Sequence, residues 1–203
     1  MQNSIFGKMI LAALELGILN SMKKVFQSLA LGFGGLFALI VLAGLILPKE
    51  FKVVSSVDVQ ATPQEVHALV GDLKEWPKWA PWNQEGSEIK IQLSEQTSGV
   101  GATQTWQDPA GKGKLVFTYS NPKEGIQYDV FFDESPQAQI GQIAYVSLSE
   151  GKTQVSWVMK GKVDALLGGI LATIFPSMIR PMFDQGLSRL SNILAEQKEG
   201  IKS

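Results

Sequence analysis

The sequence predicts an α+β fold: one membrane-spanning helix, then a seven-stranded antiparallel sheet combined with a long C-terminal helix. Three observations predict it. The 24 residues between Lys24 and Lys49 carry no charge. From Phe51 to about residue 163, short segments alternate apolar and polar side chains between turn signals. The last 40 residues return to a helical period.

Composition narrows the possible functions. The 203 residues are 45% hydrophobic and 18% charged, which is typical of a globular domain with an appendage. A net charge of -1 and the absence of a Lys/Arg-rich run argue against nucleic acid as a partner. No cysteine is present, and His67 is the only histidine, so Cys-ligated and two-histidine metal sites are excluded. We expect no cofactor and no metal.

The N-terminal apolar segment predicts a membrane anchor. Residues 28–47 form a 20-residue apolar stretch, of which twelve are Leu, Ile, Val or Phe. This is the length a helix needs to cross a hydrocarbon core of about 30 Å. A cleavable signal peptide is the rival interpretation, but the stretch exceeds the usual run of about 7–15 residues, and ILPKEF offers no small-x-small cleavage site. We therefore expect a leader at 1–24, an uncleaved anchor at 25–48 and a folded domain at 49–203.

Charge around the anchor predicts its orientation. Three lysines and one glutamate precede it, so the positive-inside rule places the N-terminus in the cytoplasm. For a bacterial protein, this predicts a single-pass inner-membrane location with the domain on the periplasmic side. Ala30, Gly34 and Ala38 form a small-residue face at spacing i, i+4, i+8, which would allow self-association through the span. Such spacing is common by chance, and we favour simple anchoring.

After Pro48, the chain takes on the pattern of a first strand and a first helix. Phe51, Val53, Ser55, Val57 and Val59 alternate with a more polar set. Thr62-Pro63-Gln64-Glu65 then supplies an N-cap, a proline in the first turn and a capping-box glutamate. The helix that follows places four apolar residues on one face: Val66, Leu69, Val70 and Leu73. Pro77 and Pro81 prevent its regular continuation.

Six further strands follow at hairpin spacing, which predicts an antiparallel sheet. Alternation assigns inward faces to Ile89, Ile91 and Leu93; to Val100, Ala102, Gln104 and Trp106; to Leu115, Phe117 and Tyr119; to Ile126, Tyr128, Val130 and Phe132; and to Val155, Trp157 and Met159. In the sixth strand, either Ile143 and Tyr145 or their neighbours Ala144 and Val146 face inward, and the pattern leaves both registers open.

The C-terminal segment predicts a long helix with one apolar stripe. The stripe comprises Met178, Ile179, Met182, Phe183, Leu187, Leu190 and Leu194. Pro176 and Pro181 are expected to break or kink the helix in its early part.

Three local motifs carry a resemblance to a known superfamily. They are D-L-x-x-W-P-x-W-x-P-W after the first helix, G-V-G-A-x-x-x-W on a strand and V-S-W-V-M-x-G on the last strand. With the element order, they resemble the START-like (SRPBCC) superfamily and its polyketide cyclase/dehydrase branch, in particular membrane-anchored bacterial members. The resemblance covers about residues 50–197. It implies a helix-grip fold, in which the sheet wraps around the C-terminal helix and encloses an apolar cavity for a lipid, quinone or polyketide-like ligand.

In such a fold, the inner face of the sheet is both core and ligand wall. The residues that the resemblance places in contact with ligand are Trp79, Gln104, Trp106, Phe117, Tyr119, Tyr128, Val130, Trp157 and Met159. The inward polar groups are tyrosines and Gln104, which suit orientation of a carbonyl or hydroxyl better than proton abstraction. We assign no catalytic residue, and we interpret His67 as a partly exposed helix residue.

EWPKWAPW, residues 75–82, concentrates three of the five tryptophans. Trp76 and Trp79 lie three positions apart, so one helical turn places both on one face. For Trp76 and Trp79 we favour a role in closing one end of the core over contact with a ligand. An indole has one donor and no titratable group, which excludes acid/base catalysis by these residues.

Three functional hypotheses follow. The favoured one is a membrane-anchored domain that binds or shuttles a hydrophobic small molecule and is not an enzyme. The second is a cyclase/dehydrase-type enzyme, in which Tyr and Gln groups steer a polyketide-like substrate. The third is an interaction or regulatory domain whose groove receives a segment of a partner protein.

Overall fold

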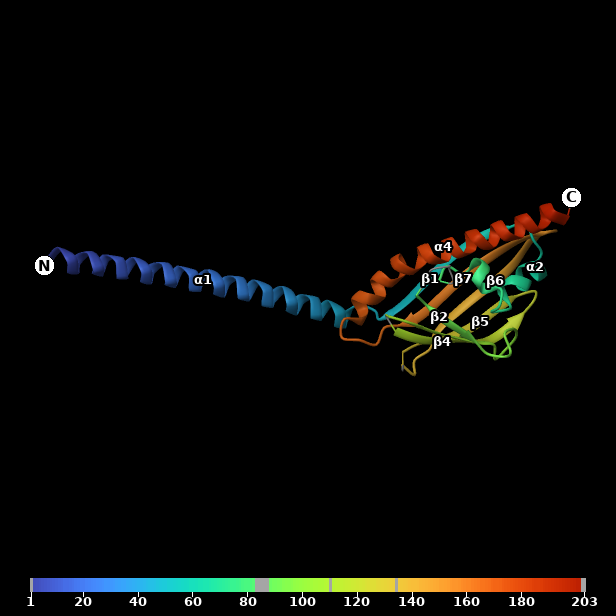
Figure 1. Ribbon diagram of the computed structural model, residues 1–203, viewed down its shortest axis with the longest axis horizontal. Coiled ribbons are helices and arrows are strands. Elements are labelled where there is room, and N and C mark those ends of the chain that lie inside the picture. The colour runs from blue at the N-terminus through green and yellow to red at the C-terminus, as the bar shows by residue number, and fades with distance from the viewer. Residues whose placement is uncertain (1, 83–87, 110, 134, 202–203) are drawn as a thin grey trace.

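The computed structural model describes residues 2–82, 88–109, 111–133 and 135–201. Figure 1 shows a long N-terminal helix that extends away from a domain formed by a curved sheet and a second long helix. The elements are α1 (Gln2–Ile46), β1 (Glu50–Val59), α2 (Pro63–Val70), α3 (Trp76–Trp79), β2 (Lys90–Leu93), β3 (Thr103–Asp108), β4 (Gly111–Asn121), β5 (Gly125–Phe132), β6 (Gln139–Ser149), β7 (Lys152–Lys162) and α4 (Gly168–Ile201). The predicted α+β fold and element order are confirmed.

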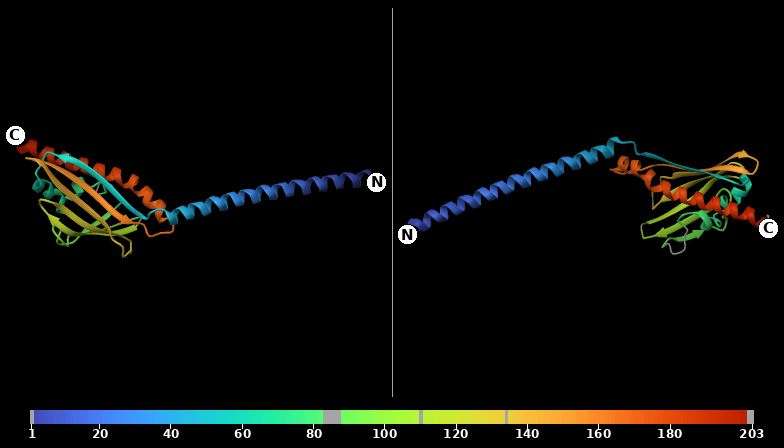
Figure 2. Two further views of the ribbon diagram at one scale, coloured as in Figure 1. Left: turned by 180° about the vertical axis from the view of Figure 1, so that it is seen from behind. Right: turned by 90° about the horizontal axis from the view of Figure 1, so that it is seen from above.

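The seven strands form one antiparallel sheet in the order β1-β7-β6-β5-β4-β3-β2. Strands β2 to β7 follow one another as neighbours, whereas β1 pairs with β7, so the first and last strands lie side by side. The sheet curves, and α4 lies across its hollow side (Figure 2). This is the helix-grip arrangement that the motifs predicted.

The buried face of the sheet follows the predicted alternation over most of its length. Val53, Leu115, Ile126, Val155 and Trp157 are all buried. Strand β6 buries Ile143 and Tyr145, which settles the register that the sequence left open. Val146, on the opposite face of the same strand, is exposed.

The inward assignment of Tyr119 is wrong. The pairing of β4 with β5 shifts register between Phe117 and Tyr119, which is a β-bulge. Because a one-residue slip reverses the faces of a strand, Tyr119 turns outward and is 36% exposed, while Ser120 takes the inward position opposite Ile126.

The inward assignment of Val100 is also wrong. Val100 lies in a turn between Gly99 and Gly101, both of which have positive φ, and β3 begins only at Thr103. Leu93 lies on the predicted face, opposite Gln104, but its side chain is exposed because it ends the short edge strand β2.

Helix α2 begins as its sequence predicts. The Thr62 hydroxyl accepts a hydrogen bond from the Glu65 backbone N–H, and the Glu65 carboxylate accepts one from the Thr62 N–H at 2.6 Å. The Thr62 backbone N–H, and after it the Thr62 hydroxyl, donate to the Glu65 carboxylate and hold its pKa below the ordinary value. The helix buries Val66, Leu69 and Val70 against the core.

Helix α4 continues through both prolines, so of the predicted break or kink the structure shows a bend and no break. Pro176 and Pro181 lie inside one helix of 34 residues. Each proline lacks the N–H that a helix normally pairs with the carbonyl four residues earlier. The helix accommodates this by bending in its early, orange part (Figure 1). From Phe183 onward the stripe is buried as predicted, with Phe183, Leu187 and Leu190 in the core, whereas Met178 and Met182 of the predicted stripe are exposed.

Helix α1 runs without interruption through the expected leader and anchor. Within it, Met22–Ile46 is long and apolar enough to cross a membrane, and its side chains have little protein around them. The end of α1 meets the start of α4. A Cβ built at Gly44 would lie 2.9 Å from the Leu167 Cα, and one built at Gly169 would lie 2.5 Å from the Leu47 carbonyl oxygen. Glycines at these two positions therefore allow the close approach of the two helices.

Candidate functional site

A cavity of about 620 Å³ lies between the inner face of the sheet and the early half of α4. Its walls are largely apolar. The sheet contributes Phe51, Gln104, Trp106, Asp108, Leu115, Tyr128, Val130, Phe132, Gln139, Met159 and Lys162; helix α4 contributes Phe175, Met178, Ile179, Met182 and Phe183; connecting segments contribute Trp82, Ile89, Ser135, Gln137, Val163 and Asp164. The cavity thus lies where strand alternation and the helical stripe of α4 face each other.

Gln104 is an unusual residue in this wall. It is only 2% exposed, and its Oε1 has no hydrogen-bond partner in the described part of the chain. The β3–β4 register places it opposite Leu115, and the β2–β3 register opposite Leu93. An unsatisfied buried polar group costs about 1–3 kcal/mol of stability. Gln104 is therefore a lining residue with a buried acceptor that has no donor among the described residues.

Tyr128 is a second lining residue with a buried polar group. Its hydroxyl accepts a hydrogen bond of 2.7 Å from Trp157 Nε1, and Trp157 stacks on Phe183 with ring centroids 4.1 Å apart. Burial raises the pKa of the Tyr128 hydroxyl, which therefore stays protonated. Because Trp157 donates to the oxygen, the Tyr128 proton itself is not used in this bond. Trp157 orients Tyr128 from behind the wall.

The exposed polar residues of the cavity lining lie at the end of the domain where α1 joins it. They are Ser135 and the ion pair of Lys162 with Asp164 at 4.0 Å, whereas the lining residue Gln137 is half-buried. The backbone of the neighbouring Val163 donates to the Lys49 carbonyl at 2.9 Å, which ties this rim to the residue that follows the anchor.

The opposite end of the core is closed by α3. Trp76 and Trp79 are fully buried, with centroids 5.2 Å apart. Trp76 Nε1 donates to the Val70 carbonyl at 2.9 Å, and Trp79 Nε1 to the Leu69 carbonyl at 3.1 Å. Both buried indole N–H groups thus donate to carbonyls in the last turn of α2 and are not left unpaired.

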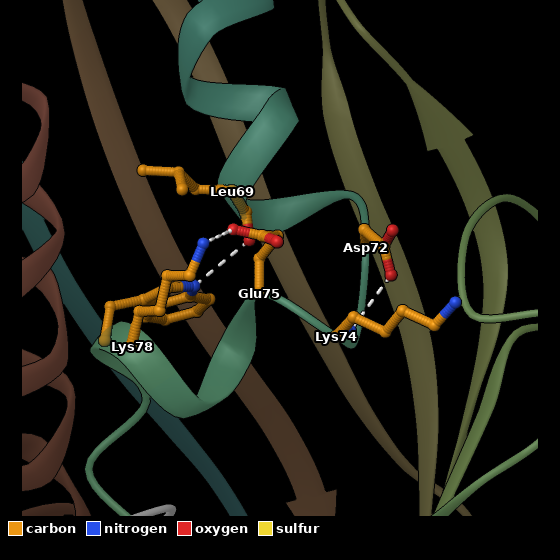
Figure 3. Close-up of polar contacts among 6 residues, drawn as sticks. Leu69, Asp72, Lys74, Glu75 and Lys78 are labelled. Carbon is orange, nitrogen blue, oxygen red and sulfur yellow. Dashed lines mark hydrogen bonds and ion pairs between the residues drawn. The ribbon is translucent and has the colours of Figure 1, made fainter. Parts of the chain in front are cut away.

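Polar contacts fix the segment that carries this closure (Figure 3). Asp72 accepts a hydrogen bond from the Lys74 backbone N–H at 2.9 Å, and Lys78 pairs with Glu75 one turn earlier. Leu73 N donates to the Thr97 carbonyl at 2.9 Å, which links the segment to the β2–β3 connection. Asp72 therefore has the local hydrogen-bonding role expected at a helix end.

Five of the nine predicted ligand residues come together in the cavity wall: Gln104, Trp106, Tyr128, Val130 and Met159. Their contact with a ligand stays a prediction. The other four lie elsewhere. Trp79, Phe117 and Trp157 are buried behind the wall, and Tyr119 lies on the outer face of the sheet with its hydroxyl bonded to Glu124. That bond raises the pKa of Tyr119.

The sequence reasoning missed the contribution of α4 and of Trp82. Phe175, Ile179, Met182 and Phe183 form the wall opposite the sheet. The apolar stripe of this helix was the available signal, because residues that face a sheet also face any space left between the two layers.

His67 lies in a separate polar cluster outside the cavity wall. Its Nδ1 is 3.3 Å from the Tyr145 hydroxyl, and its Nε2 is 3.3 Å from the Ser120 hydroxyl, which the β4 bulge turns inward. Burial lowers the pKa of His67 and raises that of Tyr145. The half-buried position agrees with the predicted structural role, and none of the three side chains lines the cavity.

Within the described residues, no group of three or more His, Cys, Asp or Glu side chains is arranged to hold a metal ion.

Comparison with protein families gives one match over the folded domain. The family model for polyketide cyclase/dehydrase and lipid transport proteins matches residues 50–195, well over half of the chain. None of the curated proteins matches the sequence.

Several solved structures share the fold. A protein from Chromobacterium violaceum is 21% identical, with 70% of this chain and 96% of that chain covered and a TM-score of 0.53. Norcoclaurine synthase from Thalictrum flavum, solved with dopamine and hydroxybenzaldehyde, is 12% identical, with 72% and 87% covered and a TM-score of 0.54. The Aha1 dimer from Colwellia psychrerythraea is 14% identical, with 70% and 95% covered and a TM-score of 0.52. At these identities the likeness concerns the fold.

Proposed function

The chain belongs to the polyketide cyclase/dehydrase and lipid transport family, and we propose that its domain binds a hydrophobic small molecule between the sheet and α4 while α1 tethers it to a membrane. The observation that carries this proposal is the apolar cavity of about 620 Å³. Sites for small molecules typically measure roughly 300–1,000 Å³ and are mostly apolar with a few polar groups. Protein interiors otherwise pack with few voids larger than a water molecule, so a space of this size calls for an occupant.

The polar atoms of the wall indicate the chemistry of the ligand. Gln104 Oε1 accepts and lacks a donor among the described residues, and the Tyr128 hydroxyl retains its proton. A largely apolar molecule with one hydroxyl or comparable polar group fits this wall. The apolar part supplies most of the binding free energy, at about 25 cal/mol for each Å² buried. The polar part fixes its orientation.

Helix α1 supports the tether. Its residues from Met22 to Ile46 form the one helix in the described chain that is long and apolar enough to span a bilayer. A signal sequence passes the same test of length and composition. The contacts of Gly44 and Leu47 with the start of α4 favour a retained helix, because cleavage would remove the partner of Leu167 and Gly169. The orientation with the domain outside the cytoplasm stays the prediction of the positive-inside rule.

A binding role is favoured over catalysis by the character of the wall. The charged lining residues Asp108, Lys162 and Asp164 are exposed or half-buried. The buried polar groups are an amide, Gln104, and the phenol of Tyr128, whose pKa is raised away from neutrality. General acid/base catalysis requires a group that titrates near the working pH.

Titration of the full chain with an apolar fluorescent probe, in mild detergent, tests the proposal. Val130→Trp fills the cavity, and Val146→Trp places the same side chain on the exposed face of β6 as a matched control. We expect the native chain and Val146→Trp to bind the probe and Val130→Trp to lose binding while keeping its circular dichroism spectrum. Equal probe binding by all three would place the site elsewhere and refute the proposal.

A further inference from the structure

One side of the early half of α4 is apolar and uncovered. We call it the α4 apolar face; on the helix it comprises Leu171, Ile174, Met178 and Met182, and it continues into Leu166 and Leu167 of the turn that leads into α4. Their side chains are between 37% and 62% exposed. From Leu167 onward they are spaced by four, three, four and four residues, which places them in a single row along the helix.

The same side of α4 changes character further along. Beyond Met182, the exposed positions that continue the row are polar: Gln185, Ser188, Asn192, Glu196 and Glu199. The later half of the helix therefore has the surface of a solvated helix. Contiguous exposed apolar residues on a soluble surface mark an interaction site. The change within one helix localises that site to the part nearest α1.

The contacts between α1 and α4 indicate what covers the face. Gly44 lies against Leu167, and Gly169 lies against the Leu47 carbonyl. Figure 1 shows the end of α1 meeting the start of α4. If α1 crosses the bilayer up to Leu47, the start of α4 lies at the same depth as the last turn of the span, at the boundary of the hydrocarbon core.

The charges around this junction fit a lipid headgroup layer. Among residues 49–52 and 160–164, four are basic and two are acidic: Lys49, Lys52, Lys160 and Lys162 against Glu50 and Asp164. Basic residues beside an apolar helix face are typical of contact with anionic lipids. A protein partner would also cover the face, but only the bilayer is continuous with α1.

We propose that the α4 apolar face enters the headgroup region of the bilayer beside α1 and holds the mouth of the cavity against the lipid. The proposal rests on the membrane tether of the proposed function. Met178 and Met182 belong to the α4 apolar face and also line the cavity. An apolar ligand thereby passes between lipid and cavity along these side chains without crossing water.

The absence of cysteine from the chain allows a direct test with single-cysteine variants. Leu171→Cys and Met178→Cys probe the α4 apolar face, Asn192→Cys probes the polar half of the same helix, and Leu36→Cys probes the middle of the span. Each full-length variant is labelled with a polarity-sensitive fluorophore and reconstituted into phosphatidylcholine vesicles, with and without phosphatidylglycerol. Lipids that carry a spin label near the headgroup, or deep in the acyl chain, then quench the fluorophores that they contact.

We expect fluorophores at positions 171 and 178 to be blue-shifted in vesicles and quenched by the headgroup-labelled lipid, with stronger quenching in anionic vesicles. The fluorophore at position 192 should show neither effect. The deep label should quench position 36. If the fluorophore at position 36 is quenched but those at 171 and 178 respond no more than the one at 192, the membrane contact of α4 is overturned and the tether still holds. No quenching at 36 would overturn the tether and this proposal with it. A blue shift at 171 and 178 that depends on protein density and not on the quencher would assign the face to a second copy of the chain, which also overturns the proposal.

Discussion

Replacement of Gln104 by leucine should stabilise the empty protein and weaken ligand binding. The side chain is almost completely buried in an apolar wall, and its Oε1 has no partner among the described residues. Leucine has a similar volume and no polar atom. The substitution removes the cost of the orphaned oxygen and adds an apolar contact beside Leu115, its neighbour across β3 and β4.

The expected magnitudes follow from the unmade hydrogen bond. A buried polar group without a partner costs about 1–3 kcal/mol, so Gln104→Leu should raise the free energy of unfolding by about that amount. A ligand that donates to Gln104 would lose one hydrogen bond, worth about 0.5–1.5 kcal/mol, and its Kd would rise about 2- to 13-fold. Stability and affinity should therefore change in opposite directions, as is common for residues kept for function.

Urea unfolding of the full chain in mild detergent measures the first effect. All five tryptophans lie between residues 76 and 157, so their fluorescence reports on the domain and not on α1. Gln107→Leu is the matched control, because Gln107 is an exposed glutamine on the same strand. Its effect should stay within about 0.5 kcal/mol. Probe titration of the same variants measures the second effect.

Two results would refute the reasoning. A Gln104→Leu variant that is less stable than the native chain would show that the amide has a favourable partner in the empty protein. A stabilised variant with unchanged affinity would show that Gln104 does not contact the ligand.

Three further predictions concern the framework of the domain. Trp79→Phe should lower the free energy of unfolding by about 1–3 kcal/mol, because it leaves the buried Leu69 carbonyl unpaired, and should leave probe affinity unchanged. Burial lowers the pKa of His67, so the folded state binds its proton less readily than the unfolded state does. The contribution of the neutral imidazole to the free energy of unfolding is therefore complete above the ordinary pKa of 6.5 and is lost as the pH falls below it. The difference in urea midpoint between the native chain and His67→Gln should thus shrink from about pH 7.5 to about pH 5.5, and a constant difference would contradict this. Thr62→Ala should cost about 1 kcal/mol in urea unfolding through loss of the α2 cap, with Gln64→Ala as a neutral comparison.

The sheet was predictable because its strands bury one face and expose the other. The alternation rule failed where the backbone departed from regular strand geometry. The bulge after Phe117 reversed the face of Tyr119, and nothing in the residue types around it signals the extra residue. In β6, the register was ambiguous because both alternating sets contain apolar side chains, Ile143 and Tyr145 against Ala144 and Val146. Only the pairing with β5 and β7 decides between them.

The cavity was harder to predict than the fold. Alternation identifies which strand residues face the helix, but not where along the sheet the helix lies close and where it leaves space. Trp157 and Met159 share a face of β7, yet Phe183 stacks on Trp157, and the open space begins at Met159.

The exposed apolar row of α4 was hard to predict for a similar reason. Helical periodicity placed Met178 and Met182 in a core stripe, and only the position of the sheet shows that they lie at its margin.

Native mass spectrometry of the full chain, released from lipid nanodiscs, tests the central claim most directly. The native chain is compared with Val130→Trp, in which the added indole occupies the cavity, and with Val146→Trp as the control. We predict a one-to-one complex of the native chain and the control with an apolar small molecule, absent from Val130→Trp. Equal amounts of bound molecule in Val130→Trp and the native chain, or a native chain that carries none and binds none from a panel of lipids and quinones, would contradict the account.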